Sequence, residues 1–131
     1  MSPSVPDLIV RLDQAGLMAY GGATWDWHRV HYDGDLARQR GLKGPIADGQ
    51  MFGALIARQI RKWAGPCARF VEMEFRNRRF VTPPNVVTIS SQILSSQTIE
   101  GSDRVDIVST IRDQDGQIIV ENARTIIEVP K

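Results

Sequence analysis

The chain concentrates its acid–base chemistry in one stretch, residues 24–33, with the sequence TWDWHRVHYD. This stretch holds both histidines of the chain, two carboxylates and two tryptophans. Histidine titrates near neutral pH, and a neighbouring carboxylate can orient it or share its work. Asp26 and His31 therefore form a candidate acid–base pair. The alternative interpretation is a polar loop with ordinary tryptophan anchors.

A metal site is another use of the same stretch. Two imidazoles and two carboxylates match the ligand types of non-haem iron or hydrolytic zinc sites, and here they are Asp26, His28, His31 and Asp33. The sequence has no further histidine to add. We therefore prefer the acid–base interpretation, which metal analysis of the purified protein separates from this one.

Length and composition restrict the class of protein. The chain has 131 residues, a net charge of +1 and a single cysteine, Cys67. This fits one domain, residues 1–131, that buries a core without disulfides. The small charge gives no support for binding nucleic acid or a membrane surface, and no apolar run reaches the roughly 18 residues of a membrane span. The first residues lack a secretory signal, so we expect a cytoplasmic protein.

Short elements are expected around the acid–base stretch. Residues 8–10 are apolar and suit an edge strand. Asp13 is placed to cap a brief helix that ends at Gly21 and Gly22. Residues 35–40 predict another short helix before Gly41, which leaves the acid–base stretch in a loop.

The strongest helix pattern begins after Asp48, a natural N-cap. Apolar residues recur at spacings of three and four as far as Trp63, which we expect in the core, and Gly65 with Pro66 ends the pattern. The first half has almost no polar side chain after Gln50, which predicts burial on nearly every face.

Strand patterns follow this helix, in residues 71–75, 86–94, 105–111 and 117–129. Val71, Met73 and Phe75 alternate with charged residues, so we expect them on one face of a strand. Residues 97–103 predict a polar connection, and residues 113–116 a hairpin turn. One apolar helix followed by about four strands predicts an α+β fold, with an antiparallel sheet wrapped around a long central helix.

With these residues, the sequence resembles the hot-dog fold and, more narrowly, the MaoC-like (R)-specific enoyl-CoA hydratase and 3-hydroxyacyl-thioester dehydratase family. The family pattern Ala-Ser-Gly-Asp-x-Asn-Pro-Ile-His-x-Asp corresponds to residues 23–33, ATWDWHRVHYD. Its pattern Gly-x-x-x-Pro-Ile-Ala-His-Gly-Met corresponds to residues 41–51, GLKGPIADGQM. Residues 76–85, RNRRFVTPPN, are a degraded form of its Phe-x-x-Pro-Val-x-Pro-Gly-Asp segment. The likeness covers about residues 8–129.

Three departures from the family pattern stand out. His-Arg replaces Asn-Pro in the central stretch, Asp48 replaces the usual histidine, and Ala57 stands where a serine is frequent. The aspartate and histidine of the family are both retained, as Asp26 and His31. The resemblance therefore implies a catalytic subunit with an unusual pocket.

The resemblance implies reversible addition of water to a trans-2-enoyl thioester, without a cofactor. Asp26 and His31 would hold the water, one removing a proton and the other delivering one, with the assignment left open. By the same resemblance, the Gly49 N–H at the helix N-terminus donates to the thioester oxyanion, and a residue without a Cβ lets the acyl group approach.

Asp48 opposes this arrangement, because a carboxylate lowers the positive potential that an oxyanion would feel. We expect its side chain to turn away, toward Arg29, Lys43 or a partner subunit. The alternative is that this position no longer serves an oxyanion and that the protein hydrates poorly.

Residues that bind substrate are less sharply defined. Arg76, Arg78 and Arg79 either meet the phosphates of coenzyme A or of a carrier-protein pantetheine arm, or lie solvated at a strand end. Trp25 and Trp27 either wall the acyl pocket or anchor the core or an interface.

Ala57, with Gly53 and Ala54, either leaves room for an acyl tunnel or allows close packing of the helix on the sheet. Hot-dog protomers pair along sheet edges, so we expect a homodimer or a heterodimer with another hot-dog subunit. Two further rivals are a non-catalytic partner in a heteromeric dehydratase and a thioesterase. Retention of the Asp-x-x-x-x-His pattern argues against both. The acyl chain and its carrier stay open.

Overall fold

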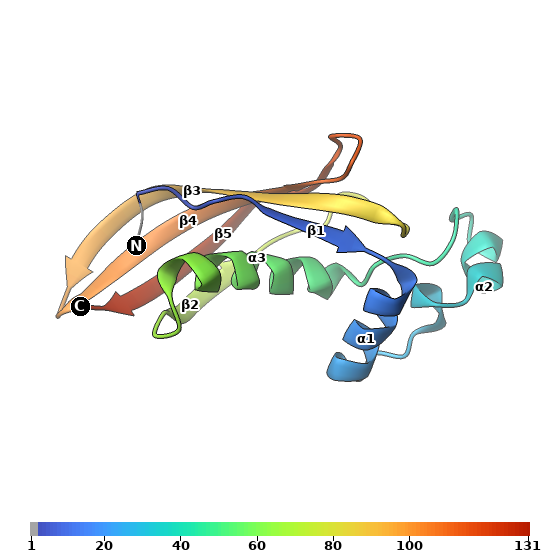
Figure 1. The fold of residues 1–131 in the computed structure, drawn as a ribbon, viewed down its shortest axis with the longest axis horizontal. Coiled ribbons are helices and arrows are strands. Elements are labelled where there is room, and N and C mark those ends of the chain that lie inside the picture. The colour runs from blue at the N-terminus through green and yellow to red at the C-terminus, as the bar shows by residue number, and fades with distance from the viewer. Residues whose placement is uncertain (1–2) are drawn as a thin grey trace.

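The computed structural model describes residues 3–131 and shows one long helix lying against a curved antiparallel sheet (Figure 1). The five strands follow the spatial order β1-β3-β4-β5-β2. They are β1 (Leu8–Leu12), β2 (Arg69–Glu74), β3 (Asn85–Ile99), β4 (Ser102–Arg112) and β5 (Ile118–Pro130). The α+β architecture and the edge strand expected at residues 8–10 are therefore confirmed.

The central helix α3 (Gly49–Ala64) packs its apolar face on the sheet. Phe52, Ile56 and Ile60 are fully buried there, against inward residues of the three long strands. The first half of the helix is largely buried as expected, and the exception after Gln50 is Ala54, which lies with Arg58 on an uncovered stripe. Trp63 is partly buried and packs against the core.

The hairpin between β3 and β4 is longer than expected. The two strands remain paired as far as Ile99 and Ser102, so the predicted polar connection at residues 97–103 is mostly strand. Glu100 and Gly101 turn the chain with positive φ angles of 49° and 79°. The residues at this tip are largely exposed, so they carry no apolar alternation that would predict a strand.

The structure of β2 differs from the alternation expected at residues 71–75. Its pairing with β5 shifts register between Phe70 and Glu72, as at a β-bulge. Phe70 takes an inward place beside Met73, while Val71 is exposed. A period-two pattern cannot reveal an extra residue in one strand.

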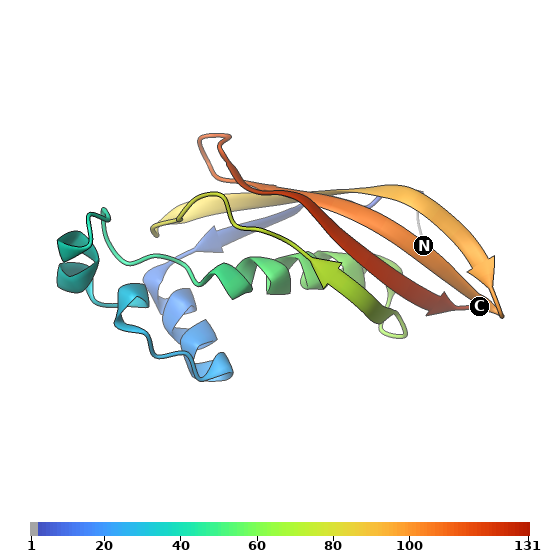
Figure 2. The same ribbon diagram turned by 180° about the vertical axis from the view of Figure 1, so that it is seen from behind.

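The N-terminal helices lie at one end of the molecule, where α1 is drawn below the end of β1 and α2 extends past it (Figures 1 and 2). They are α1 (Gln14–Thr24), the short 3-10 helix η1 (Arg29–His31) and α2 (Gly34–Gln39). Asp13 caps α1 as expected, since its Oδ1 accepts a hydrogen bond from the Gly16 N–H at 2.7 Å. The segment between α1 and α2 crosses near the start of α3. Among the described helices, none is long and apolar enough to cross a membrane.

The expected end of α1 at Gly21 and Gly22 was wrong. The helix continues to Thr24 and ends where Trp25 adopts a left-handed conformation with φ 59°. Gly21 instead permits a close approach, because a Cβ there would lie 2.8 Å from the backbone oxygen of Asp26. The glycine therefore lets the chain fold back on the helix, and it positions the following loop.

Candidate active site

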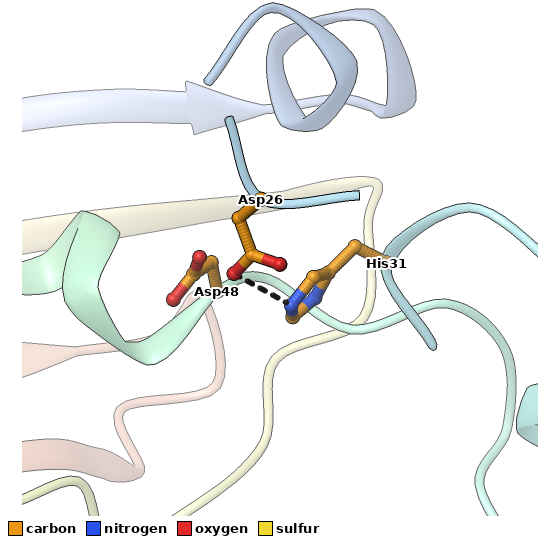
Figure 3. A group of neighbouring side chains, drawn as sticks. All are labelled: Asp26, His31 and Asp48. Atoms are coloured by element: carbon orange, nitrogen blue, oxygen red, sulfur yellow. Dashed lines mark ion pairs between the residues drawn. The ribbon is translucent and has the colours of Figure 1, made fainter. Parts of the chain in front are cut away.

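Three titratable side chains converge at the N-terminus of α3 (Figure 3). Asp26 comes from the loop after α1, His31 from η1, and Asp48 is the N-cap of α3. One oxygen or nitrogen atom from each lies within 4.8 Å of the others. His31 Nε2 is 3.7 Å from Asp26 Oδ2. The structure thus brings the predicted acid–base pair together and adds a second carboxyl to it.

Backbone hydrogen bonds hold Asp26 in place. Its own N–H donates to the Gly21 carbonyl at 3.0 Å, which fastens the loop to α1. Its Oδ1 accepts from the His28 N–H at 3.2 Å, which leaves Oδ2 facing His31.

The tautomer of His31 follows from its partner on the other side of the ring. Nδ1 lies 2.7 Å from the Ile46 carbonyl oxygen, which can only accept, so Nδ1 carries the hydrogen. In the neutral ring, Nε2 is then an acceptor that faces Asp26. A gap of 3.7 Å is long for a direct hydrogen bond and suits a bridging water. The His31 side chain is 16% exposed and that of Asp26 is 40% exposed, so solvent reaches the pair.

The two carboxyls differ in their electrostatics. Hydrogen bonding from Asp48, helped by the His28 N–H, holds the pKa of Asp26 below its usual value. Burial raises the pKa of Asp48, and the hydrogen bond with Asp26 raises it further. Burial, with Asp48 and Asp26 nearby, also raises the pKa of Tyr20. Asp26 is therefore the anion of the pair, and Asp48 retains its proton more readily.

The expectation that Asp48 turns away from the site was wrong. Its carboxyl accepts from the Gln50 N–H at 2.9 Å, and this capping contact holds it near Asp26. Of the two cations expected to draw it away, Arg29 pairs with Asp33 at 2.5 Å, and Lys43 lines a separate hollow.

Gly49 is the first residue of α3, and within residues 3–131 its N–H has no hydrogen-bond partner. This agrees with the expected donor position. A Cβ here would collide with the side-chain amide of Asn77, so the missing side chain makes room for Asn77. The approach of an acyl group stays a prediction.

Asn77 and Tyr20 are neighbours of the site that sequence reasoning missed. Asn77 is placed by an isolated bridge to Val120 in β5, and the next residue, Arg78, donates its N–H to the Ile119 carbonyl at 2.8 Å. Its position inside the arginine-rich segment gave no signal of this role. Tyr20 lies in α1, and the helix pattern there gives no signal of the site.

The structure does not bring together the four residues considered as metal ligands in the sequence, Asp26, His28, His31 and Asp33. His28 Nδ1 accepts from the Val30 N–H at 3.1 Å, and Asp33 caps α2 while pairing with Arg29. Among the described residues, the one group with ligand-type atoms close together is Asp26, His31 and Asp48. His28 and Asp33 thus serve the local fold of the loop.

The two tryptophans lie at the surface beside Asp26. Trp25 is 81% exposed and Trp27 is 44% exposed, and their rings meet edge to face with centroids 6.0 Å apart. The expectation of core anchors is therefore wrong for both. A pocket wall or an interface remains open to them as a role.

The three arginines do not form one cluster. Arg76 and Arg78 line a hollow of about 400 Å³ beside β5, where Arg78 pairs with Glu121 at 3.3 Å. Arg79 lines a different hollow of about 590 Å³, together with Lys43. A shared phosphate site for all three is not supported by this arrangement.

The small residues of α3 also lie in different surroundings. A Cβ on Gly53 would lie 2.5 Å from the Phe75 ring, so this glycine serves close packing on the sheet. Ala57 is half-buried and Ala54 is exposed, on the uncovered side of the helix.

Comparison with known proteins identifies the family. The family model for the MaoC like domain matches residues 5–113, so the chain belongs to the MaoC-like domain family. That membership supports a hydratase or dehydratase as the class of enzyme. No curated protein sequence matches the chain.

Solved structures confirm the hot-dog fold. An (R)-hydratase from A. caviae involved in PHA biosynthesis has a TM-score of 0.88 at 16% identity, over 99% of this chain and 98% of its own. The unliganded R-hydratase PhaJ1 from Pseudomonas aeruginosa gives 0.86 at 22% identity, over 96% and 79%. A chain of the ChsH1-ChsH2 complex from Mycobacterium tuberculosis gives 0.83 at 23% identity, over 97% and 94%. At these identities the likeness concerns the fold.

Proposed function

We propose that the protein catalyses reversible hydration of a trans-2-enoyl thioester to the (R)-3-hydroxyacyl thioester. The observation that carries this proposal is the pair of acceptors, Asp26 Oδ2 and His31 Nε2, held 3.7 Å apart at the N-terminus of α3. Two acceptors at this spacing can hold both hydrogens of one water and direct its oxygen toward a β-carbon. Membership of the MaoC-like family supports the same chemistry.

The reaction requires a proton to leave the water and a proton to reach the α-carbon. As the water oxygen bonds to the β-carbon, an O–H bond breaks and its proton passes to Asp26 or to His31 Nε2. The π electrons of the double bond move onto the thioester oxygen. They return when the α-carbon takes a proton, which restores the acid–base pair. The Ile46 carbonyl holds the Nδ1 hydrogen and thereby steadies the ring in either charge state.

The enolate-like oxygen needs fixed donors, because charge develops on it only in the transition state. The unpartnered Gly49 N–H and the positive end of α3 supply such donors. Asn77, whose side-chain amide lies against Gly49, can add another. No cofactor is needed for this chemistry.

We propose coenzyme A or an acyl carrier protein as the carrier, and a pair of hot-dog subunits as the working unit. Two similar structures are heteromeric complexes, ChsH1-ChsH2 and the 3R-hydroxyacyl-ACP dehydratase HadBC, both from Mycobacterium tuberculosis. They favour a heterodimer as the alternative to self-association. An isolated monomer with full activity would contradict the proposal of a pair.

The test is a hydration assay with crotonyl-CoA and with longer or bulkier enoyl-CoA esters. Loss of the conjugated enoyl absorbance, with (R)-3-hydroxyacyl-CoA as the product, is expected. A thiol reagent in parallel detects hydrolysis, and release of free coenzyme A in place of hydration would overturn the proposal. Stoichiometric zinc or iron in the purified protein would favour metal-dependent chemistry at Asp26, His31 and Asp48 instead.

A further inference from the structure

The side-chain amide of Asn77 points at the first residue of α3. Its Nδ2 atom is 2.2 Å from the point where a Cβ on Gly49 would stand, and its Oδ1 atom is 4.0 Å from that point. The nitrogen end of the amide therefore faces Gly49. Among the described residues, no group forms a hydrogen bond with this amide, and the side chain is exposed. Both of its N–H donors are thus open to a ligand.

The Asn77 amide and the Gly49 N–H are close enough to serve one acceptor. Standard backbone geometry puts the missing Cβ about 2.5 Å from the Gly49 nitrogen, so the two nitrogens are at most about 4.7 Å apart. Two donors that each lie about 2.9 Å from one oxygen can be up to about 5.8 Å apart. A helical Cα–Cβ bond leans toward the N-terminus, and the free N–H groups point the same way. Both donors therefore face the space in front of α3.

The acid–base pair borders the same space. Asp48 makes the connection, because its carboxyl lies with Asp26 and His31 while the next peptide bond carries the Gly49 N–H. The conjugated part of an enoyl thioester is short, so its β-carbon and its carbonyl oxygen lie close together. The β-carbon can meet the water held by Asp26 and His31 while the oxygen meets the two donors.

Strand β5 fixes the backbone that carries the amide. Asn77 forms a bridge with Val120, and the Arg78 N–H donates to the Ile119 carbonyl at 2.8 Å. A donor on such a support needs little reorganisation when charge develops on the oxygen, which is the property that makes a donor effective in a transition state.

The amide is a feature of this chain. The family pattern given for residues 76–85 begins with phenylalanine, and alignment of Val81 and Pro83 with its valine and second proline places Asn77 at that phenylalanine. A phenyl ring donates no hydrogen bond. The resemblance therefore does not imply a donor at position 77.

We propose that Asn77 is a catalytic residue, whose side-chain N–H binds the thioester oxygen together with the Gly49 N–H, and that position 49 is glycine so that this amide can reach its place. This inference rests on the proposed function and deepens it, since it assigns the second donor and couples it sterically to Gly49. The amide keeps its hydrogens throughout. The two hydrogen bonds stabilise the electrons that move onto the oxygen as water adds, until the α-carbon takes its proton.

The first test removes the donor. Asn77→Ala should lower kcat for the best enoyl-CoA by about 10²-fold with KM little changed, because the hydrogen bond strengthens as charge develops. Asn77→Asp keeps the shape of the side chain but offers no N–H, so it should lose at least as much. The matched control is Gln92→Ala, an exposed amide on the outward face of β3 beside the inward Ile93, which should keep the wild-type kcat. Wild-type kcat in a folded Asn77→Ala protein would overturn the proposal.

A double-mutant cycle tests the coupling to Gly49. Gly49→Ala places a methyl group against the amide and should lower kcat about as much as Asn77→Ala does. In the Asn77→Ala background the same methyl group meets open space, so the further loss should be less than about threefold. An equal loss in both backgrounds would overturn the coupling, because the methyl group would then obstruct the substrate and not Asn77.

An unreactive thioester separates this inference from the proposed function. Butyryl-CoA labelled with ¹³C at the carbonyl has no double bond to hydrate, and the infrared stretch of its carbonyl falls in frequency when donors bind the oxygen. The fall on binding should be smaller in Asn77→Ala than in the wild type. Equal frequencies in the two proteins would overturn the inference even in an active hydratase. A wild-type protein that shifts the carbonyl through Asn77 but does not hydrate enoyl-CoA would instead contradict the proposed function.

Discussion

Two polar clusters lie at different positions along α3, and they differ in whether their polar atoms still have hydrogen-bonding capacity to spare. Near the middle of α3, Gln59 is buried and donates to the carbonyls of Pro6 and Ile89 at 2.9 and 2.8 Å. Its oxygen accepts from Ser91, whose hydroxyl also pairs with Ser109 at 2.6 Å. At the N-terminus of α3, Asp26, His31 and Asp48 lie together with solvent access.

The comparison shows that polarity alone does not mark a site. The Gln59 cluster is neutral, and its amide has partners on both ends, so it can only hold the structure together. The aspartate–histidine cluster titrates, and its two acceptors face each other across 3.7 Å. Spare capacity to bind a water and a proton distinguishes the second cluster from the first.

The sharpest way to break this comparison is to remove the acid–base pair. Asp26→Asn and His31→Ala should each lower kcat/KM for the best enoyl-CoA by about 10²- to 10⁴-fold, because each removes a proton acceptor in the transition state. The enoyl absorbance assay measures this. Circular dichroism should show an unchanged fold. Full activity in either variant would remove the assignment of the site.

The opposite result is expected in the Gln59 cluster. Gln59→Met keeps the size of the side chain but removes the Gln59 hydrogen bonds to two carbonyls and leaves the Ser91 hydroxyl with Ser109 alone, so the free energy of unfolding should fall by about 1–3 kcal/mol. Denaturant unfolding measures the change. The kcat of the folded variant should stay near that of the wild type. A loss of kcat without a loss of stability would mean that this cluster serves catalysis.

The smallest effect concerns the end of α1. Trp25 holds a left-handed conformation at φ 59°, which costs a residue with a Cβ about 1 kcal/mol. Trp25→Gly should therefore raise the free energy of unfolding by up to about 1 kcal/mol, with Trp27→Ala as a control that leaves this conformation unchanged. Lower activity together with higher stability would assign Trp25 to the substrate. Lower stability would show that its ring packs more firmly than its exposure suggests.

The body of the fold was predictable because its signals are periodic. Phe52, Ile56 and Ile60 recur at helical spacing, and the inward residues of β4 alternate, so buried faces can be read from the order of residues. Val71 shows where this fails, because the bulge in β2 changes the face without changing the pattern.

The site was predictable only in part. Residue types identified Asp26 and His31, since carboxylates and imidazoles are common proton-transfer groups in enzymes. The orientation of Asp48 was not predictable, because it depends on a capping bond and on where Asp26 arrives after the turn at Gly21. Asn77 reaches Gly49 through pairing with a distant strand, which no local pattern records.

The loop that carries His31 is clamped to the segment before α3 at a single residue. Ile46 gives its N–H to the Val30 carbonyl at 3.1 Å and takes the His31 Nδ1 hydrogen on its own carbonyl. Both contacts use main-chain atoms, so they depend on the path of the backbone, and proline at position 46 would remove the first of them because it lacks the N–H. The spacing of Asp26 and His31 therefore depends on the backbone path of this segment more than on the identity of its side chains.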